Sequence, residues 1–200
     1  MAIKVANNKS LSAITALPSA ISSGAMTLLS TQTASSSSTI DFTSGIDSTY
    51  DEYVFKFYDI HPQTDNTHFT VNFRDGSSAY DATKTTTWFR SQHDEANSDT
   101  ALEYVASVDL AQSTDGARLM TSMSSDSDHG GNGYLHLYNP SSTTFVKNFI
   151  ARTSSVWYLD YEWDAYLAGY CNVTAAIDGV QFAMSSGNID SGVIKLYGIS

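Results

Sequence analysis

Large apolar side chains at every second position are the feature that most constrains the fold of this chain. In the run YVFKFY, Tyr53, Phe55 and Phe57 occupy alternate positions, and the run leads into the His61-Pro62 corner. Alternate residues of a β-strand point to the same face of a sheet, so these three rings are predicted to share one face. Similar runs recur along the chain, separated at roughly 8–12-residue intervals by turn-forming residues, which is typical of an all-β domain.

The alternating runs predict an antiparallel β-sandwich, jelly-roll-like, with two sheets stacked about 10 Å apart and an extended N-terminal arm. Residues 27–31 and 39–43 are expected to form a hairpin, and residues 69–73 are expected to pair with residues 53–58. Only a short helix, around residues 94–102, is compatible with the sequence. Further strands are predicted over residues 85–90, 102–108, 118–122, 134–138, 145–151, 156–163, 180–184 and 192–197.

The chain is predicted to divide into an arm, residues 1–24, and the β-sandwich domain, residues 25–200. Small residues dominate the arm, and Pro18 argues against a long helix there. We expect the apolar side chains of the arm to be buried on a neighbouring subunit, with a partly disordered terminus as the alternative. The expected docking residues are Ile3, Val5, Leu11, Ile14, Leu17 and Ile21.

Composition and charge exclude two classes of partner. The net charge of −11 and only 10 Lys and Arg residues argue against nucleic-acid binding, which needs clustered basic side chains. No run approaches the roughly 18–20 apolar residues that a membrane-spanning helix needs, and the spaced apolar residues of the arm do not match a secretion signal. Hydrophobic residues make up 42% of the chain, which is enough for a folded core.

The sequence contains no recognisable catalytic motif, so we predict a non-enzyme that needs no cofactor. The sequence has neither a phosphate-binding loop nor a nucleophile elbow. Cys171 is the only cysteine, and we expect it to be a small buried side chain or, alternatively, to bridge two chains. Residues 126–133 begin like a calcium loop, but Leu137 stands where an EF-hand needs its glutamate. We therefore predict a flexible turn and no metal, with a looser loop site as the alternative.

The best candidate for a recognition surface is the segment 156–169, taken as one strand. Its odd positions are core-like, whereas its even positions place Asp160, Glu162 and Asp164 between Tyr158 and Tyr166. That row could hold sugar hydroxyls or a cation, or it could be a solvated sheet edge. A glycosidase pair among its carboxylates is disfavoured, because nothing else in the chain indicates a groove. The aromatic residues named as candidates for glycan binding are Trp88, Trp157, Tyr158, Tyr161 and Trp163.

Four stretches share a further pattern of alternating apolar runs and Ser/Thr turns. The stretch Met26–Pro62 resembles a module that recurs in structural proteins of tailed bacteriophages, especially phages of marine cyanobacteria, and Ser185–Gly198 resembles its closing strand. Thr64–Tyr80 and Tyr134–Ala151 fit the same pattern, so the resemblance covers most of residues 26–198. It implies a virion structural protein, either a tail appendage or fibre or a capsid decoration protein, located on the phage particle surface.

The resemblance also implies the partners, which are other virion proteins and further copies of the chain, with a trimer as the expected homo-oligomer. The alternative function is a carbohydrate-binding module that recognises a host surface glycan, and the two functions are compatible. A cellular adhesin or surface-layer domain fits the composition as well, but the phage-like pattern and the missing secretion signal disfavour it.

Overall fold

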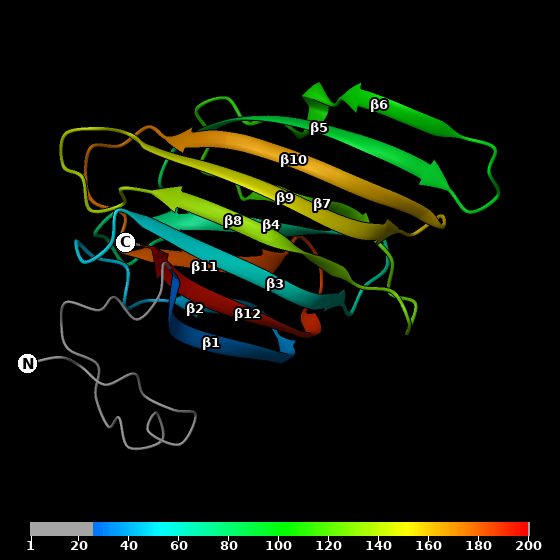
Figure 1. The fold of residues 1–200 in the computed structure, drawn as a ribbon, viewed down its shortest axis with the longest axis horizontal. Coiled ribbons are helices and arrows are strands. Elements are labelled where there is room, and N and C mark those ends of the chain that lie inside the picture. The colour runs from blue at the N-terminus through cyan, green and yellow to red at the C-terminus, as the bar shows by residue number, and fades with distance from the viewer. Residues whose placement is uncertain (1–25, 200) are drawn as a thin grey trace, which may run out of the picture.

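A computed structural model describes residues 26–199, which form twelve strands and one short 3-10 turn, η2 (Ala106–Val108) (Figure 1). No helix among the described residues is long and apolar enough to cross a membrane. The strands are β1 (Met26–Ser37), β2 (Thr39–Phe42), β3 (Glu52–Pro62), β4 (Thr67–Arg74), β5 (Lys84–Asp94), β6 (Thr100–Tyr104), β7 (Ala117–Met123), β8 (Gly131–Tyr138), β9 (Lys147–Trp157), β10 (Tyr161–Cys171), β11 (Gly179–Met184) and β12 (Ile189–Ile199).

All strand pairs are antiparallel, and they form one sheet with the order β1-β12-β3-β8-β9-β7-β4-β11-β2. On a branch from this path, β10 pairs with β9 and β5, and β6 pairs with β5. The two ends of this path are β1 and β2, and in the chain only Ser38 separates them. The two edges of the sheet therefore lie close together, and the sheet nearly closes into a barrel. Gln32 Nε2 on β1 donates to the backbone oxygen of Asp41 on β2 at 3.5 Å across the remaining gap. The predicted all-β antiparallel class is confirmed, whereas this pairing does not confirm a jelly-roll-like sandwich.

Two predicted pairings are wrong. Residues 27–31 and 39–43 do not form a hairpin, because β1 pairs with β12 and β2 pairs with β11. Residues 69–73 pair with β7 and β11 and not with residues 53–58. The rings of Phe57 and Phe69 instead meet inside the barrel, with centroids 5.3 Å apart. Segments close in the sequence therefore face one another across the core.

Aromatic rings from opposite walls of the barrel fill its centre. Tyr53, Phe55 and Phe57 are buried together on one face of β3, as the alternation predicted. Phe182 on β11 is fully buried, and its ring lies 5.3 Å from the rings of both Phe55 and Phe57. This core fixes the inner face of each strand and so leaves the alternate residues on the outside.

Cys171 is a buried, free thiol, as one of the two alternatives for it predicted. In the sheet it lies opposite Lys84 on one side and Lys147 on the other. Burial raises the pKa of the thiol to about 12 and lowers the pKa of Lys84 to about 8. The Lys84 ammonium donates to the backbone oxygens of Ala82 and Thr114, at 3.0 and 3.3 Å. The thiol is thus a neutral core group at physiological pH.

The segment 156–163 is not one strand but the hairpin that joins β9 to β10. Trp157 and Tyr161 are register partners, and the chain reverses between them, with Asp160 at φ 62°. Aspartate tolerates this left-handed conformation because its short polar side chain can form local hydrogen bonds. The short helix that the sequence allowed around residues 94–102 does not form, because residues 100–104 form strand β6 and pair with β5.

Candidate functional site

A row of directly opposed residues crosses the outer face of six neighbouring strands. The register places each member against the next one: Lys56 with Tyr134, Tyr134 with Arg152, Arg152 with Tyr166, Tyr166 with Phe89, and Phe89 with Tyr104. We call these residues the aromatic row. These residues lie on β3, β8, β9, β10, β5 and β6, which are neighbouring strands in that order (Figure 1).

The alternation of each strand turns this row outward. Trp88 and Leu167, the sequence neighbours of Phe89 and Tyr166, are buried in the core, so Phe89 and Tyr166 must point away from it. Phe89 and Tyr134 remain 40% and 37% exposed, and Tyr104, near the sheet edge, is 60% exposed. These aromatic side chains are therefore available to a ligand.

Contacts between neighbouring strands hold the centre of the row in place. The rings of Phe89 and Tyr166 stack with centroids 4.6 Å apart and an interplanar angle of 1°, and the Arg152 guanidinium lies 4.9 Å from the centroid of the Tyr166 ring. Arg152 Nε and Nη2 donate to the two carboxylate oxygens of Asp164 at 2.9 and 2.8 Å. The Tyr166 hydroxyl donates to the same carboxylate at 3.1 Å. A forked pair of this kind fixes the direction of both side chains.

These contacts also set the charges of the site. The hydrogen bonds from Arg152 lower the pKa of Asp164 below its ordinary value, and the same hydrogen bonds raise the pKa of Arg152. Desolvation, together with the hydrogen bond to Asp164, raises the pKa of Tyr166. At neutral pH the site therefore presents a carboxylate, a guanidinium and a neutral phenol.

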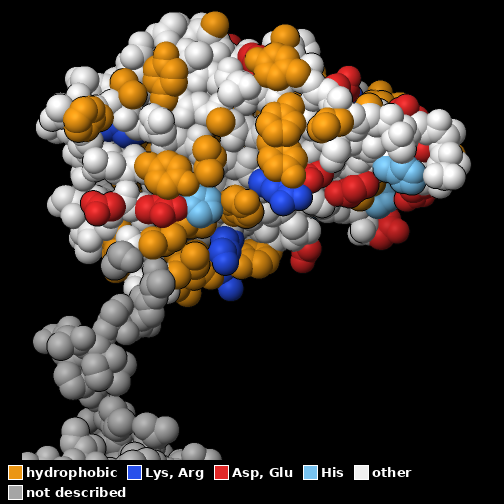
Figure 2. Space-filling view, turned by 45° about the horizontal axis from the view of Figure 1, so that its top comes forward, with side chains coloured by type: hydrophobic (Ala, Val, Ile, Leu, Met, Phe, Trp, Pro, Cys, Tyr) orange, Lys and Arg blue, Asp and Glu red, His pale blue; other side chains and the backbone are white. Residues whose placement is uncertain are grey.

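The aromatic row separates two shallow hollows of different chemistry. The first, of about 300 Å³, is mostly apolar and reaches Thr87, Ile150 and Ala168. The second, of about 440 Å³, is polar; Tyr134 and Arg152 line both hollows. The polar side chains that line only the second are Asn132, Thr153, Ser154, Glu162 and Asp164. Figure 2 shows hydrophobic side chains spread over this side of the molecule with basic and acidic side chains among them.

The glycan-binding candidates from the sequence lie elsewhere. Trp88 is fully buried and Trp163 is 4% exposed, so neither ring is available at the surface. Trp157 stacks on Trp163 with centroids 4.9 Å apart and packs edge-on against Tyr158 and Tyr161. Four of the five candidates are thus brought together at the β9–β10 hairpin, where Trp157, Tyr158 and Tyr161 remain partly exposed. The docking candidates of the arm lie outside the described residues.

The even-numbered face of segment 156–169 was predicted better. Glu162, Asp164 and Tyr166 share the outer face of β10. Tyr158 and Asp160 leave this face because they belong to the turn. The sequence did not single out Phe89, Tyr134 and Arg152, because their outward positions follow from alternation but their juxtaposition depends on the register.

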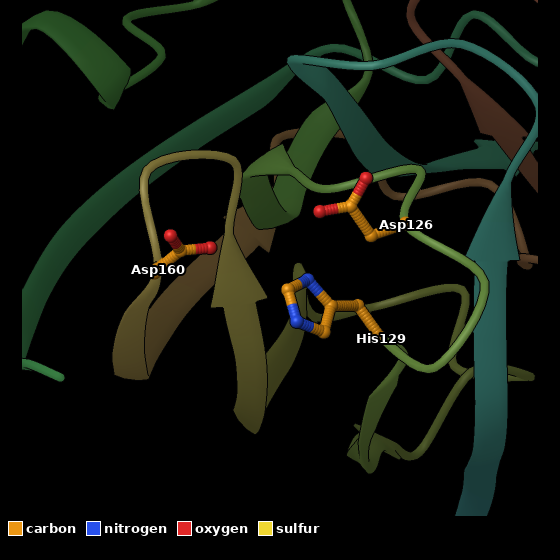
Figure 3. Close-up of side chains that lie close together, drawn as sticks. All are labelled: Asp126, His129 and Asp160. Carbon is orange, nitrogen blue, oxygen red and sulfur yellow. The ribbon is translucent and has the colours of Figure 1, made fainter.

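A second group of side chains gathers at one end of the sheet. Asp126, His129 and Asp160 each place one potential metal-ligating atom within 4.8 Å of the others (Figure 3). Asp126 and His129 come from the loop between β7 and β8, and Asp160 comes from the β9–β10 turn. Among residues 26–199, these are the three side chains whose geometry could hold a metal ion.

Comparison with known proteins assigns this chain to no group: no family model, no curated protein and no solved structure matches it.

Proposed function

We propose that this domain binds saccharides through the aromatic row, as the recognition part of a phage virion surface protein. The observation that supports saccharide binding is the division of the row's surroundings into an apolar hollow and a polar hollow. Ligand sites are typically lined by apolar and aromatic side chains with a few well-placed polar groups. A sugar ring matches this division, because it combines apolar C–H faces with a rim of hydroxyl groups.

The polar groups of the site are arranged before any ligand arrives. Asp164 is held by Arg152 and Tyr166, and Ser154 Oγ donates to Glu162 at 2.6 Å. Side chains that are already ordered lose little conformational entropy on binding, so hydrogen bonds to a ligand contribute more of their energy to affinity. Both carboxylates retain lone pairs for sugar hydroxyls, and the guanidinium supplies donors.

Replacement of Tyr134 by alanine is the sharpest test of this surface. Tyr134 lines both hollows, and because its side chain is partly exposed its removal leaves the core intact. A glycan array with the full chain should identify a ligand, and titration calorimetry should show at least a tenfold loss of affinity for it in Tyr134→Ala, which corresponds to about 1.4 kcal/mol.

The matched control is Tyr58→Ala, because Tyr58 has a similar exposed fraction, 38%, and lines neither hollow. This variant should bind with the affinity of the wild-type chain. A blank array, or a Tyr134→Ala variant with unchanged affinity, would remove the saccharide proposal.

The virion setting is supported by the sequence resemblance over residues 26–198 and by the apolar composition of residues 1–24. The proposed partners are other virion proteins and further copies of this chain, in a trimer. The finer architecture that the alternating runs predict, a jelly-roll-like sandwich, remains part of this proposal.

Deletion of residues 1–24 is expected to abolish association with particles and to leave a folded β-domain. The physical reason is that the deleted segment would supply the apolar area for docking, at about 25 cal/mol per Å² before ordering costs. Co-sedimentation with phage particles measures the first effect and circular dichroism the second. A truncated chain that still sediments with particles would contradict the docking role of the arm.

A further inference from the structure

We propose that Asp126, His129 and Asp160 form a divalent metal site that links the β7–β8 loop to the β9–β10 turn, and that its preferred ion is Zn²⁺. The three side chains come from two segments that are distant in the sequence and adjacent in space (Figure 3). Two carboxylate oxygens and one imidazole nitrogen make a mixed donor set. The site is separate from the aromatic row and does not depend on the saccharide proposal.

Backbone hydrogen bonds fix the loop that carries the first two ligands. The amide of His129 donates to the backbone oxygen of Asp126 at 2.9 Å, and the amide of Asp126 donates to Ser124 Oγ at 3.1 Å. The amide of Ser125 donates to Asp65 Oδ1 at 3.1 Å, which ties the loop to the segment before β4. The loop is thus held in shape without using the carboxylate of Asp126.

The third ligand is fixed in the same manner. The amide of Asp160 donates to the backbone oxygen of Trp157 at 2.9 Å, and the amide of Glu95 donates to the backbone oxygen of Asp160 at 3.1 Å. Within residues 26–199 the carboxylate groups of Asp126 and Asp160 have no hydrogen-bond partner. Both carboxylates are therefore free to bind an ion.

One ring nitrogen of His129 lacks a partner within this group of side chains. Its Nδ1 atom is fully buried and, among the described residues, has no hydrogen-bond partner. A buried polar atom needs a partner, and a water molecule or an ion can supply one here. Figure 3 shows the ring between the two carboxylates, with the nitrogen beside the substituted ring carbon turned toward Asp126. Nδ1 is thus directed into the group of ligands.

The donor set selects among metal ions. Calcium and magnesium take oxygen ligands, whereas imidazole favours zinc and other transition metals. Zinc binds at about 2.0–2.2 Å from nitrogen and oxygen, so tetrahedral ligand atoms lie about 3.4 Å apart. The present separations of up to 4.8 Å mean that zinc would draw the three side chains closer together. Water would complete the coordination.

Titration of the metal-free full chain with ZnCl₂ tests the site. Calorimetry should show one zinc ion per chain, and zinc at 100 times its Kd should raise the Tm by about 5–10 °C, because the ion binds only the folded state. His129→Ala and Asp160→Asn should each weaken zinc binding at least tenfold. Nitrogen-15 NMR of the histidine rings should show the zinc-dependent shift on Nδ1 of His129.

Two control variants separate this site from general zinc binding by surface side chains. His93→Ala removes an exposed histidine, and Asp51→Asn removes an exposed carboxylate outside the loop and the turn; both should bind zinc as the wild-type chain does. If the wild-type chain fails to bind zinc, the proposal is wrong. It is also wrong if folded His129→Ala and Asp160→Asn bind zinc normally, or if tenfold excess calcium displaces the zinc.

Discussion

Replacement of Phe182 by alanine is expected to lower the free energy of unfolding by about 3–5 kcal/mol, because it leaves a cavity in the centre of the barrel. The Phe182 ring contacts Phe42, Phe55, Phe57 and Phe69, and it is fully buried. These rings belong to strands on opposite walls of the barrel, so no single strand can move inward to fill the space. The loss would be a large share of the 5–15 kcal/mol that stabilises a typical domain.

Urea denaturation followed by circular dichroism measures this effect. Phe145→Ala is the matched control, because Phe145 is 68% exposed in the loop before β9 and its removal creates no cavity. We expect the control to change the free energy of unfolding by less than about 0.5 kcal/mol. Equal effects of the two substitutions would show that the rings around Phe182 do not form the core.

The second large effect is expected for Gly133→Ala, with a loss of about 3 kcal/mol or more of unfolding free energy. Gly133 lies on β8 opposite Thr153 of β9, at φ 155°. A Cβ atom there would lie 2.8 Å from Thr153 Cα and closer still to the backbone oxygen of Arg152. These are backbone atoms in the middle of a sheet, so β8 and β9 would have to separate.

The same substitution should disturb the aromatic row, because separation of β8 from β9 moves Tyr134 away from Arg152. Thermal unfolding and saccharide titration together measure both consequences. Gly130→Ala is the control, since a Cβ atom there meets only ordinary contacts, the nearest at 3.6 Å from Asp59 Cα. A Gly133→Ala variant with wild-type Tm would contradict the described pairing of β8 with β9.

The strands were predictable because their signal is local. The large aromatic side chains of Tyr53, Phe55 and Phe57 stand at every second position, and a strand with one face in the core shows this period. The hairpin predicted between residues 27–31 and 39–43 failed because alternation indicates a strand and not its partner. The expected turn is missing: the turn-like residue Ser36, at φ 47°, lies within β1, which continues to Ser37. After Ser38 the chain enters β2, which stands at the other end of the strand order from β1.

The candidate site was predictable only in part, for a related reason. Glu162, Asp164 and Tyr166 share a face within one strand, so alternation placed them together. Phe89 and Arg152 come from other strands, and a register shift of one residue would turn either of them inward. The metal-site candidate depends equally on a contact between distant segments, Asp160 with the loop of Asp126.

The amino-acid sequence was sufficient to identify β-strands with aromatic residues on their inner faces, because the two-residue period of a strand is a local property. The three-dimensional structure was needed to establish which strands are neighbours, that β1 and β2 meet at the closing edge of a barrel, and which outward side chains form a row. Strand pairing joins segments far apart in the chain, and its hydrogen bonds are made by the backbone, which is the same at every residue. Partner and register are therefore set by the packing of the whole core.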